Sequence, residues 1–395
     1  MKIGMILDEK YPPHPRVKNE AVNLIEGGHE VVLFCLDYTG EAESEIMDGF
    51  KVVRYKTGNI VRKFSALAYS IFIYRMVMQY KVKRFIREQK PDALHIHNIR
   101  IGKAVLKAIK GYNGKIILDL HENIPEIMKM YHHVTHFPGN VLIYPSRWKK
   151  WEKKLVHESD KIVVVTEEAK DDLMENYGVE ASKILIVPNS VQPSFYLELD
   201  LKQQIIKRFE SSFSLFYFGD TGIRRGLETA IRSLVKLRDA IPTIKLIIVG
   251  SSKSDPFLKK LTVDLGVSDY VAFEGFQDEA LLQSYISASD ICISPLLRNR
   301  HHDTTYANKI FQYMALGKPL IVSDCPAQKR IVKEADCGLV FEAGNVEDFS
   351  DKVLSLYNDK GSRSRLGHNG SVFIRDKYNQ AIKSKELIEF YHSIS

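Results

Sequence analysis

Several features that mark common classes of protein are scarce or absent in this sequence. Only four cysteines occur in 395 residues and no two form a C-x-x-C pair, so we expect reduced thiols rather than disulfides or a zinc site. No apolar run reaches the roughly 20 residues that cross a bilayer. The first ten residues, MKIGMILDEK, meet an acid at Asp8, which indicates a buried strand and not a secretory signal. These absences predict a cytoplasmic protein.

What is present is an ordinary globular composition, with 45% hydrophobic and 27% charged residues. A chain of this length exceeds one hydrophobic core, so two or three domains are expected. Its net charge of +7 is uneven, because residues 1–160 hold 26 Lys+Arg against 18 Asp+Glu and the remainder carries a net −1. This asymmetry points to an anionic partner for the N-terminal part, such as a nucleic acid, a membrane or a phosphorylated substrate.

Short apolar runs alternate with amphipathic helical stretches along the chain. In the first half, the runs that predict strands are KIGMIL, HEVVLFC, KVVRY, ALHIH, KIILDL, KIVVVT and ILIVP. After a polar stretch, the same alternation of apolar runs and helical stretches begins again, and the runs are SLFYFG, KLIIVG, YVAFEGF, ICISP, PLIVSD and GLVFEAG. Continuous Val/Ile/Leu runs suit strands buried on both faces, and their alternation with helices implies right-handed βαβ units. We therefore predict an α/β fold with two doubly wound parallel sheets.

A break near residue 190 separates the predicted domains. We expect Rossmann-like domains at residues 1–190 and 191–377, and a terminal helix at residues 378–395 for which packing back on the N-terminal domain is one option. Two facing domains of this kind form an interdomain cleft between the carboxyl ends of their strands, which is where ligands bind open α/β sheets. Residues at those strand ends therefore decide the function.

The most informative stretch is TTYANKIFQYMALGKPLIVSD, residues 304–324. It predicts a polar loop, a helix that begins near Asn308 and ends at Gly317, and then a buried strand. A loop that leads into a helix N-terminus offers free N–H groups and the positive end of the helix dipole, which suits a phosphate, and Lys309 adds a cation. An ordinary strand–loop–helix connection is the alternative.

A second candidate phosphate site is FYFGDTGIRRGLETAI, residues 216–231. A strand is followed by a glycine turn at Gly219, the basic pair Arg224-Arg225, Gly226 and a helix. Because a guanidinium holds two phosphate oxygens at once, this strand, turn and helix with its basic pair is a phosphate-binding layout. A solvated arginine at the start of a helix is the alternative.

The sequence contains no strong metal-binding pattern. No D-x-D occurs, although this carboxylate pair commonly holds the divalent ion in metal-dependent nucleotide-sugar enzymes. His301-His302-Asp303 is better explained as a solvated loop, because adjacent side chains rarely converge on one ion. We expect no metal.

Polar side chains also follow the strands of the N-terminal half. KIILDLHENIPE places Asp119, His121 and Glu122 at one strand end, and ALHIHN places His97 and Asn98 at its neighbour. A lone histidine after a strand is more often structural than functional. Asn98 could line an acceptor site or cap a helix.

These segments together resemble glycosyltransferase family 4. The likeness is most specific in N-K-I-F-Q-Y-M-A-L-G-K-P-L-I-V-S (residues 308–323), D-x-H-E (residues 119–122) and SDKIVVVTEEAKDDL…ILIVPNS (residues 159–190), and a P-x-x-P-R-V run ending at Val17 also matches. The resemblance covers nearly the whole chain and implies the GT-B fold of two facing Rossmann-like domains. It also implies retention of anomeric configuration, with the donor phosphate accepting the proton of the acceptor.

The resemblance assigns roles to individual residues. Arg225 stands where the family holds the donor diphosphate and His121 where it faces the transferred sugar, so both are expected at the catalytic centre. The family's Glu-x7-Glu pair is replaced by Thr304 and Gln312, and its second diphosphate cation by Asp220. The expected donor site comprises Gly219, Arg224, Arg225, Thr304, Thr305, Asn308, Lys309 and Gln312. The expected acceptor side comprises Arg16, His97, Asn98 and Glu122, with an exposed surface arginine as the alternative for Arg16.

The expected activity is transfer of a sugar from a nucleotide sugar, a UDP-sugar by preference, to a glycan or lipid-linked acceptor in cell-surface polysaccharide or glycoconjugate synthesis. No metal or other cofactor is expected. One alternative is a degenerate transferase that only binds sugar or nucleotide as a partner subunit. This alternative is favoured by the replacements at Thr304, Gln312 and Asp220. Another is a UDP-sugar 2-epimerase, which needs additional carboxylates that the sequence does not offer.

Basic and apolar residues of the N-terminal half indicate contact with an anionic membrane. A predicted helix at residues 62–90 carries an apolar stripe within a basic surround: Phe64, Leu67, Ile71, Tyr74, Met78, Val82 and Phe85. Residues 146–154, SRWKKWEKK, add two tryptophans, which favour the membrane interface. A core-packed helix with a solvated basic face is the alternative. No nucleic acid is expected, since no binding module accompanies the charge; a peripheral position on the inner face of the cell membrane stays open.

Overall fold

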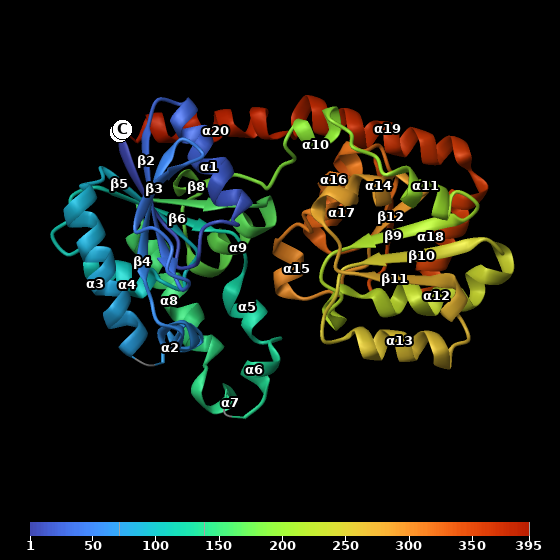
Figure 1. The fold of residues 1–395 in the computed structure, drawn as a ribbon, viewed down its shortest axis with the longest axis horizontal. Coiled ribbons are helices and arrows are strands. Elements are labelled where there is room, and N and C mark those ends of the chain that lie inside the picture. Colours follow the sequence, from blue (N-terminus) through green and yellow to red (C-terminus); the bar gives the residue numbers. More distant parts are fainter. Residues whose placement is uncertain (71, 138, 395) are drawn as a thin grey trace. The chain divides into compact units, whose positions relative to one another are not determined.

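The computed structural model describes residues 1–70, 72–137 and 139–394. The chain forms two compact units, one made of Met1–Pro188 with Lys383–Ser395 and the other of Asn189–Ile382. We refer to them as the N-terminal and the C-terminal unit. Each is an α/β sheet covered by helices on both faces (Figure 1).

An eight-stranded sheet forms the centre of the N-terminal unit, in the order β3-β4-β2-β1-β5-β6-β7-β8. Its strands are β1 (Lys2–Ile6), β2 (Glu30–Asp37), β3 (Ser44–Met47), β4 (Phe50–Lys56), β5 (Ala93–His97), β6 (Lys115–Leu120), β7 (Lys161–Val164) and β8 (Ile184–Ile186). All neighbours pair in parallel except β3 and β4, which are antiparallel. The sequence does not predict β3, because this edge strand is mostly exposed and has no apolar run.

Helices cover the two faces of this sheet unequally. The faces are distinguished by alternate residues of the strands, as Leu94 and Ile96 pack on one side and Ala93 on the other. The first side is covered by α3 (Phe72–Gln89), α4 (Gly102–Ala108), α8 (Pro145–Glu158) and α9 (Glu167–Tyr177). The second side is covered by α1 (Pro15–Glu26) and by the later part of α20 (Gln380–Ser393).

The prediction of a single helix over residues 62–90 is wrong. The structure has α2 (Asn59–Lys63), the 3-10 helix η1 (Phe64–Leu67) and then α3, while Ile71 of the expected stripe lies outside the described residues. Tyr69 explains the break. It would point away from the apolar stripe of a continuous helix, yet here it is buried, packs on Trp148 at 4.7 Å between ring centroids and donates its hydroxyl to the carbonyl of Ile99. The expected core contacts of α3 are confirmed, since its buried side chains are Tyr74, Met78, Val82 and Phe85.

The C-terminal unit contains a six-stranded parallel sheet in the order β11-β10-β9-β12-β13-β14. Its strands are β9 (Phe213–Phe218), β10 (Ile244–Val249), β11 (Val271–Gly275), β12 (Ile291–Ser294), β13 (Leu320–Ser323) and β14 (Gly338–Phe341), as the apolar runs predict. One face is covered by α12 (Leu227–Ala240), α13 (Asp255–Asp264) and α18 (Val346–Asn358). The other is covered by α11 (Gln203–Phe209), α14 (Leu282–Ser287), α16 (Lys309–Ala315), α17 (Pro326–Glu334) and α19 (Lys360–Lys377).

Each sheet reverses its strand order at one point. In the N-terminal unit the chain builds outward from β1 through β2 and then returns to place β5 on the other side of β1. In the C-terminal unit β12 returns to the free side of β9 in the same way. Ligands bind open α/β sheets at the carboxyl ends of strands beside such a reversal. The loops after β1, β5 and β6, and those after β9 and β12, are therefore where sites are expected.

Candidate functional site

In the C-terminal unit, cationic side chains gather around the turn that follows β9. Gly219 follows the strand with φ +122°, and the turn continues through the 3-10 helix η3 (Ile223–Arg225) to Gly226, which precedes the first residue of α12. Gly226 has φ +73°, and a Cβ there would lie 1.7 Å from the carbonyl oxygen of Pro295. Only glycine fits, because the turn lies directly against the chain leaving β12.

Arg224 and Arg225 belong to this turn and are partly accessible. Their guanidinium groups approach Asp220 Oδ2 at 3.5 and 3.3 Å, with side chains about one-fifth exposed. One carboxylate therefore faces two guanidinium groups, which leaves surplus positive charge at the turn. An anionic ligand such as a diphosphate fits this surplus.

Lys309, the first residue of α16, brings a third cation to the same turn. Its Nζ is buried and has no hydrogen-bond partner in the described part of the chain. It lies 3.4 Å from the centroid of the Tyr217 ring and 3.5 Å from where a Cβ on Gly219 would stand. Burial lowers the pKa of Lys309 well below its usual range, and the positive charge of Arg225 lowers it further. A buried ammonium without an acceptor is costly, and an anionic oxygen at the Gly219 turn would satisfy it.

The expectation that His301 and His302 lie in a solvated loop is wrong. Both are buried in the short helix α15 (Arg300–Thr304), which follows β12. Arg224 Nη1 donates to His302 Nε2 at 3.3 Å. Burial lowers the pKa of His302 to about 4 and that of His301 to about 2, so both rings are neutral near pH 7. His302 thus accepts from Arg224 and helps to hold that side chain at the turn.

The other predicted donor-side residues surround this cluster at the loop between β12 and α16. Thr304 donates its hydroxyl to the carbonyl of Arg300 and Thr305 to that of His301, so both hydroxyls are engaged within α15. Asn308 is exposed and accepts a hydrogen bond from Asn189. Gln312 is half-buried on α16. The hydroxyl of Thr304 therefore does not take the place of the carboxylate that the resemblance to family 4 puts at this position.

In the N-terminal unit, the predicted residues converge on one buried carboxylate, Asp119. It lies on β6 and points to the face covered by α1, where Arg16 donates to both of its oxygens at 2.9 and 3.0 Å. His121 Nε2 lies 2.6 Å from Asp119 Oδ2. Burial opposes ionisation of Asp119, but Arg16 and His121 outweigh it and hold its pKa well below the usual range. Asp119 is therefore a fixed anion beneath His121.

Arg16 is not the exposed surface residue that one reading of the sequence suggested. Its Nη1 donates to the carbonyl of Val187, and its Nη2 pairs with Glu20 at 2.9 Å one turn along α1. Glu20 itself is buried. Burial raises the pKa of its carboxyl, although the positive charge of Arg16 acts to lower it. The guanidinium thus ties α1 to β6 and to the end of β8.

His97 and Asn98 end the neighbouring strand β5. His97 is buried with Nδ1 3.1 Å from His121 Nε2, and burial together with the neighbouring His95 lowers its pKa well below the usual range. Asn98 has φ +65° and does not cap a helix, because α4 begins at Gly102 after Ile101; that alternative is wrong. Glu122 is exposed next to His121. The structure thus brings Arg16, His97 and His121 together and leaves Glu122 at the surface.

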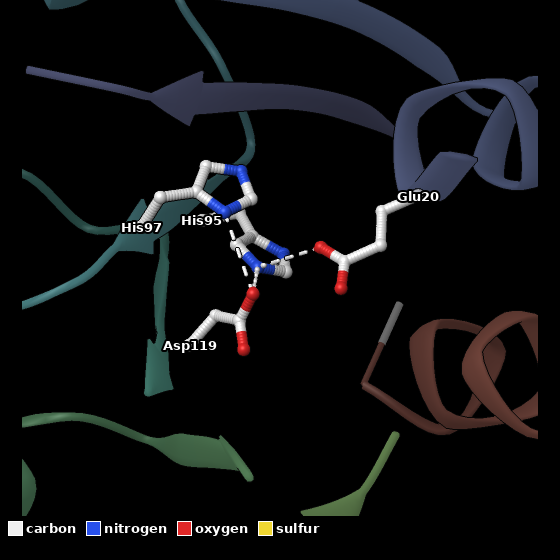
Figure 2. A group of neighbouring side chains, drawn as sticks. All are labelled: Glu20, His95, His97 and Asp119. Carbon is white, nitrogen blue, oxygen red and sulfur yellow. Dashed lines mark ion pairs between the residues drawn. The ribbon is translucent and has the colours of Figure 1, made fainter. Parts of the chain in front are cut away.

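Four of these buried groups have the donor atoms that a metal ion would need. Glu20, His95, His97 and Asp119 each offer one ligand atom, all within 4.8 Å of one another (Figure 2). The guanidinium of Arg16, however, already pairs with both carboxylates. His95 Nε2 lies 3.5 and 3.6 Å from the two carboxylates, so an Nε2–H there adds a favourable electrostatic contact with both without an ion. We therefore interpret the cluster as a proton-linked network rather than a metal site.

The sequence did not single out Glu20, His95, Tyr217 or Tyr391 as site residues. Glu20 stands four residues after Arg16, which is the spacing of a helical ion pair, and His95 alternates with His97 on one side of β5. These two spacings could have identified them. Tyr391 comes from the far end of the chain, and no local signal connects it to His95.

Two family models match the chain, one in each half. The model described as Glycosyltransferase Family 4 matches residues 16–195, and the model described as Glycosyl transferases group 1 matches residues 200–372. Together they include the Asp119 network and the Gly219 turn.

Curated relatives of similar length are distant in sequence. A phosphatidyl-myo-inositol mannosyltransferase of Mycolicibacterium smegmatis is 21% identical over all of this chain and 94% of its own. A glycosyltransferase of Methanocaldococcus jannaschii is 23% identical over 99% of this chain and 98% of its own. Both matches extend over the two units.

Solved structures share the fold. The sucrose-phosphate synthase of Thermosynechococcus elongatus superimposes with a TM-score of 0.80 at 16% identity, covering 100% of this chain and 99% of its own. The Anabaena protein HepE, solved in complex with UDP and glucose, gives a TM-score of 0.74 at 13% identity and covers 100% of both chains.

Proposed function

The chain is a glycosyltransferase of the family 4 type with the GT-B fold, and from this premise we propose that it uses a nucleoside diphosphate sugar, with UDP as the first candidate base. The observation that carries the proposal is the set of three cations around the Gly219 turn, of which Lys309 has a buried ammonium without a hydrogen-bond partner among the described residues. A diphosphate supplies an anionic acceptor to Lys309 and further acceptors to the two guanidinium groups, which share the single carboxylate of Asp220. The UDP complex of the similarly folded Anabaena protein supports the choice of base.

We further propose that the reaction proceeds without a metal ion and with retention of configuration. The sequence has no D-x-D, so charge that develops on the departing diphosphate would be stabilised by Arg225, Arg224 and Lys309. His121, held on Asp119, would contact the transferred sugar, and His97, Asn98 and Glu122 would line the acceptor side. The donor phosphate would accept the proton of the acceptor hydroxyl, so no dedicated carboxylate base is required.

The acceptor in this proposal is a glycan or a lipid-linked glycan. The mannosyltransferase of M. smegmatis, by its name, acts on a phosphatidylinositol, and other relatives are named for lipopolysaccharide core and capsular polysaccharide synthesis. A lipid-linked acceptor requires that the enzyme reach a membrane surface. Among the described residues, no helix has both the length and the apolar character to span a bilayer.

We propose that a surface of the N-terminal unit contacts an anionic membrane, but not through the tryptophans that the sequence suggested. Trp148 is buried in the core and Trp151 packs on Tyr69 at 5.8 Å between ring centroids. Two stretches without any acidic residue, 57–87 and 127–151, carry the exposed apolar side chains instead. These are Ile60, Phe72, Ile73, Met76 and Tyr80 in the first stretch and Tyr131, Phe137, Val141, Leu142 and Tyr144 in the second.

The two acid-free stretches are also strongly basic. They contain seven and four Lys+Arg respectively. Their short helices α2, α6 (His132–Thr135) and α7 (Gly139–Leu142) lie at one end of the N-terminal unit, at the bottom in Figure 1. Exposed aromatic and aliphatic side chains with basic neighbours and no carboxylates fit the interface of an anionic bilayer.

A catalytically degenerate, nucleotide-binding protein is the second candidate function. It is favoured by Gln312 and Asp220, and by Thr304, whose hydroxyl is engaged within α15 where the family usually has its first glutamate. The deciding experiment is thermal-shift screening with UDP, GDP, ADP and their sugars, followed by turnover of the stabilising donor in the presence of membrane extract. A ligand at about 100 times its dissociation constant adds roughly 2.7 kcal/mol of stability. Stabilisation with sugar release supports the transferase, stabilisation without turnover of any donor supports the degenerate protein, and no stabilisation by any nucleotide contradicts both.

A further inference from the structure

Tyr391, near the end of α20, reaches the buried network of the N-terminal unit. Its hydroxyl lies 2.5 Å from Nδ1 of His95, and both side chains are fully buried. Leu387, one turn earlier on α20, is also buried against the same face of the sheet. The final helix therefore supplies a polar contact, and not only apolar cover, to the strand ends that hold the candidate site.

The surroundings of His95 decide where its proton lies. Nε2 faces Glu20 Oε2 at 3.5 Å and Asp119 Oδ2 at 3.6 Å (Figure 2). Ionised carboxylates only accept hydrogen bonds, so a lone pair on Nε2 would be repelled by both. In the neutral ring the proton therefore belongs on Nε2, and Nδ1 accepts the hydroxyl proton of Tyr391. Tyr391 thus selects the tautomer in which the Nε2–H of His95 points toward the carboxylates of Glu20 and Asp119.

The same argument fixes the orientation of His121. Its Nε2 lies 2.6 Å from Asp119 Oδ2, so Nε2 carries the proton and Nδ1 is left as an acceptor. His121 is partly exposed, with 17% of its side chain accessible, whereas Asp119 is fully buried. Asp119 keeps this geometry because Arg16 donates to both of its oxygens, while His95 Nε2 faces the same carboxylate at 3.6 Å in a longer electrostatic contact.

We propose that Tyr391 and His95 are positioning residues for His121. Through Asp119 they hold the imidazole in its Nε2–H tautomer, so that Nδ1 accepts a hydrogen bond from a hydroxyl of the transferred sugar. The role toward the sugar depends on the proposed transferase function, whereas the tautomer is a property of the protein alone. The two can therefore be tested separately.

The first test is ¹⁵N NMR of the histidine side chains in the full-length protein, with His121 identified by the loss of its signals in His121→Asn. The wild type should show His121 protonated at Nε2. Tyr391→Phe, which keeps the buried ring, should shift His121 toward a mixture of tautomers. Tyr80→Phe is the matched control, because Tyr80 is 71% exposed on α3 and should change nothing. An unchanged His121 tautomer in Tyr391→Phe overturns the proposal.

The second test uses the transferase reaction. Tyr391→Phe should lower kcat by about 3- to 10-fold, the effect of one lost hydrogen bond, with UDP affinity and melting temperature near those of wild type. In a His121→Ala background the same substitution should have no further effect on kcat, because the group that it positions is gone. An equal loss in both backgrounds contradicts a positioning role even if the protein is an active transferase. A stoichiometric metal ion bound through His95 in the purified protein also overturns it.

Discussion

The ammonium nitrogen of Lys309 lies 3.4 Å from the centroid of the Tyr217 ring, and no described residue accepts a hydrogen bond from it. The ring face offers the ammonium some electrostatic stabilisation, but it does not replace an anionic acceptor. Tyr217 in turn donates its hydroxyl to the carbonyl of Asp220, which holds the ring at the Gly219 turn. The ammonium group of Lys309 is therefore positioned to bind an anion at the Gly219 turn.

This arrangement predicts that nucleotide binding takes up a proton. Burial and Arg225 lower the pKa of Lys309 in the free protein, whereas a diphosphate beside it would raise that pKa. Affinity for UDP should therefore fall as the pH rises from 7 to 9, and calorimetry at pH 8 in Tris and in HEPES should report net proton uptake. Lys309→Arg keeps the charge without titrating, so the uptake should disappear. Equal uptake in wild type and Lys309→Arg would assign it to another group.

Arg225→Ala should weaken UDP binding at least tenfold. The substitution removes a charge-assisted contact worth roughly 1.5–3 kcal/mol, while the partly exposed side chain makes little contribution to folding. Calorimetry on the full-length protein measures the change. Arg232→Ala is the control, because Arg232 is exposed on α12 and pairs only with Glu228 in the described contacts. Unchanged affinity in Arg225→Ala would remove this residue from the donor site.

Gln312→Glu should preserve or tighten donor binding. Gln312 is half-buried on α16, and a carboxylate there would accept ribose hydroxyls more strongly than the amide oxygen does. Because such a contact is equal in the ground and transition states, KM should change more than kcat. Steady-state kinetics over a range of donor concentrations separates the two constants. A loss of affinity for the donor would show that position 312 does not face the ribose.

Treatment with EDTA should leave donor turnover unchanged. The proposed stabilisation of the departing diphosphate comes from Arg224, Arg225 and Lys309, and these cations are not removed by a chelator. Initial rates before and after dialysis against EDTA, with and without added Mg²⁺ or Mn²⁺, provide the measurement. Activity that is lost on chelation and restored by one of these ions would assign the diphosphate charge to a metal.

Liposome binding should require both the basic and the apolar side chains of the N-terminal unit. Co-sedimentation should rise with anionic lipid content and fall with added salt. Replacing Lys149, Lys150, Lys153 and Lys154 by serine should weaken the salt-sensitive part, and Phe137→Ser with Leu142→Ser should weaken binding at all salt concentrations. Substituting Lys207, Lys253, Lys333 and Lys360 of the C-terminal unit gives a control of equal charge. Equal binding to neutral and anionic liposomes, or none, contradicts the proposal.

The apolar runs predicted nearly every strand because the strands of both sheets, apart from the edge strand β3, pair in parallel and are largely buried on two faces. Most of these strands are short runs rich in Val, Ile, Leu or Phe, and this signal is strong without any knowledge of the fold. The exception is β3, whose residues Ser44–Met47 lie at the exposed edge of the sheet. An exposed edge strand needs no apolar run, so its sequence gives little indication that it pairs with a neighbouring strand.

Side-chain environments could be predicted less well, because they depend on contacts between distant segments. His301 and His302 look like parts of a polar loop, yet they are buried against the turn that carries Arg224. Arg16 looks like the start of a surface helix, yet it pairs with Asp119, 103 residues away. The segments that form these contacts are distant in the sequence, and only the topology of each sheet brings them together in space.

The division of the chain in space differs from its order in sequence at α20. Residues from Lys383 onward belong to the N-terminal unit, although the whole C-terminal unit precedes them in the chain. During synthesis the N-terminal unit therefore remains without Tyr391, and its buried His95 without a partner hydroxyl, until the ribosome has also made the C-terminal unit. A chimera that exchanges donor specificity between relatives must accordingly take residues 383–395 from the parent that supplies the N-terminal unit, and a cut at residue 189 alone would separate the histidine network from its last member.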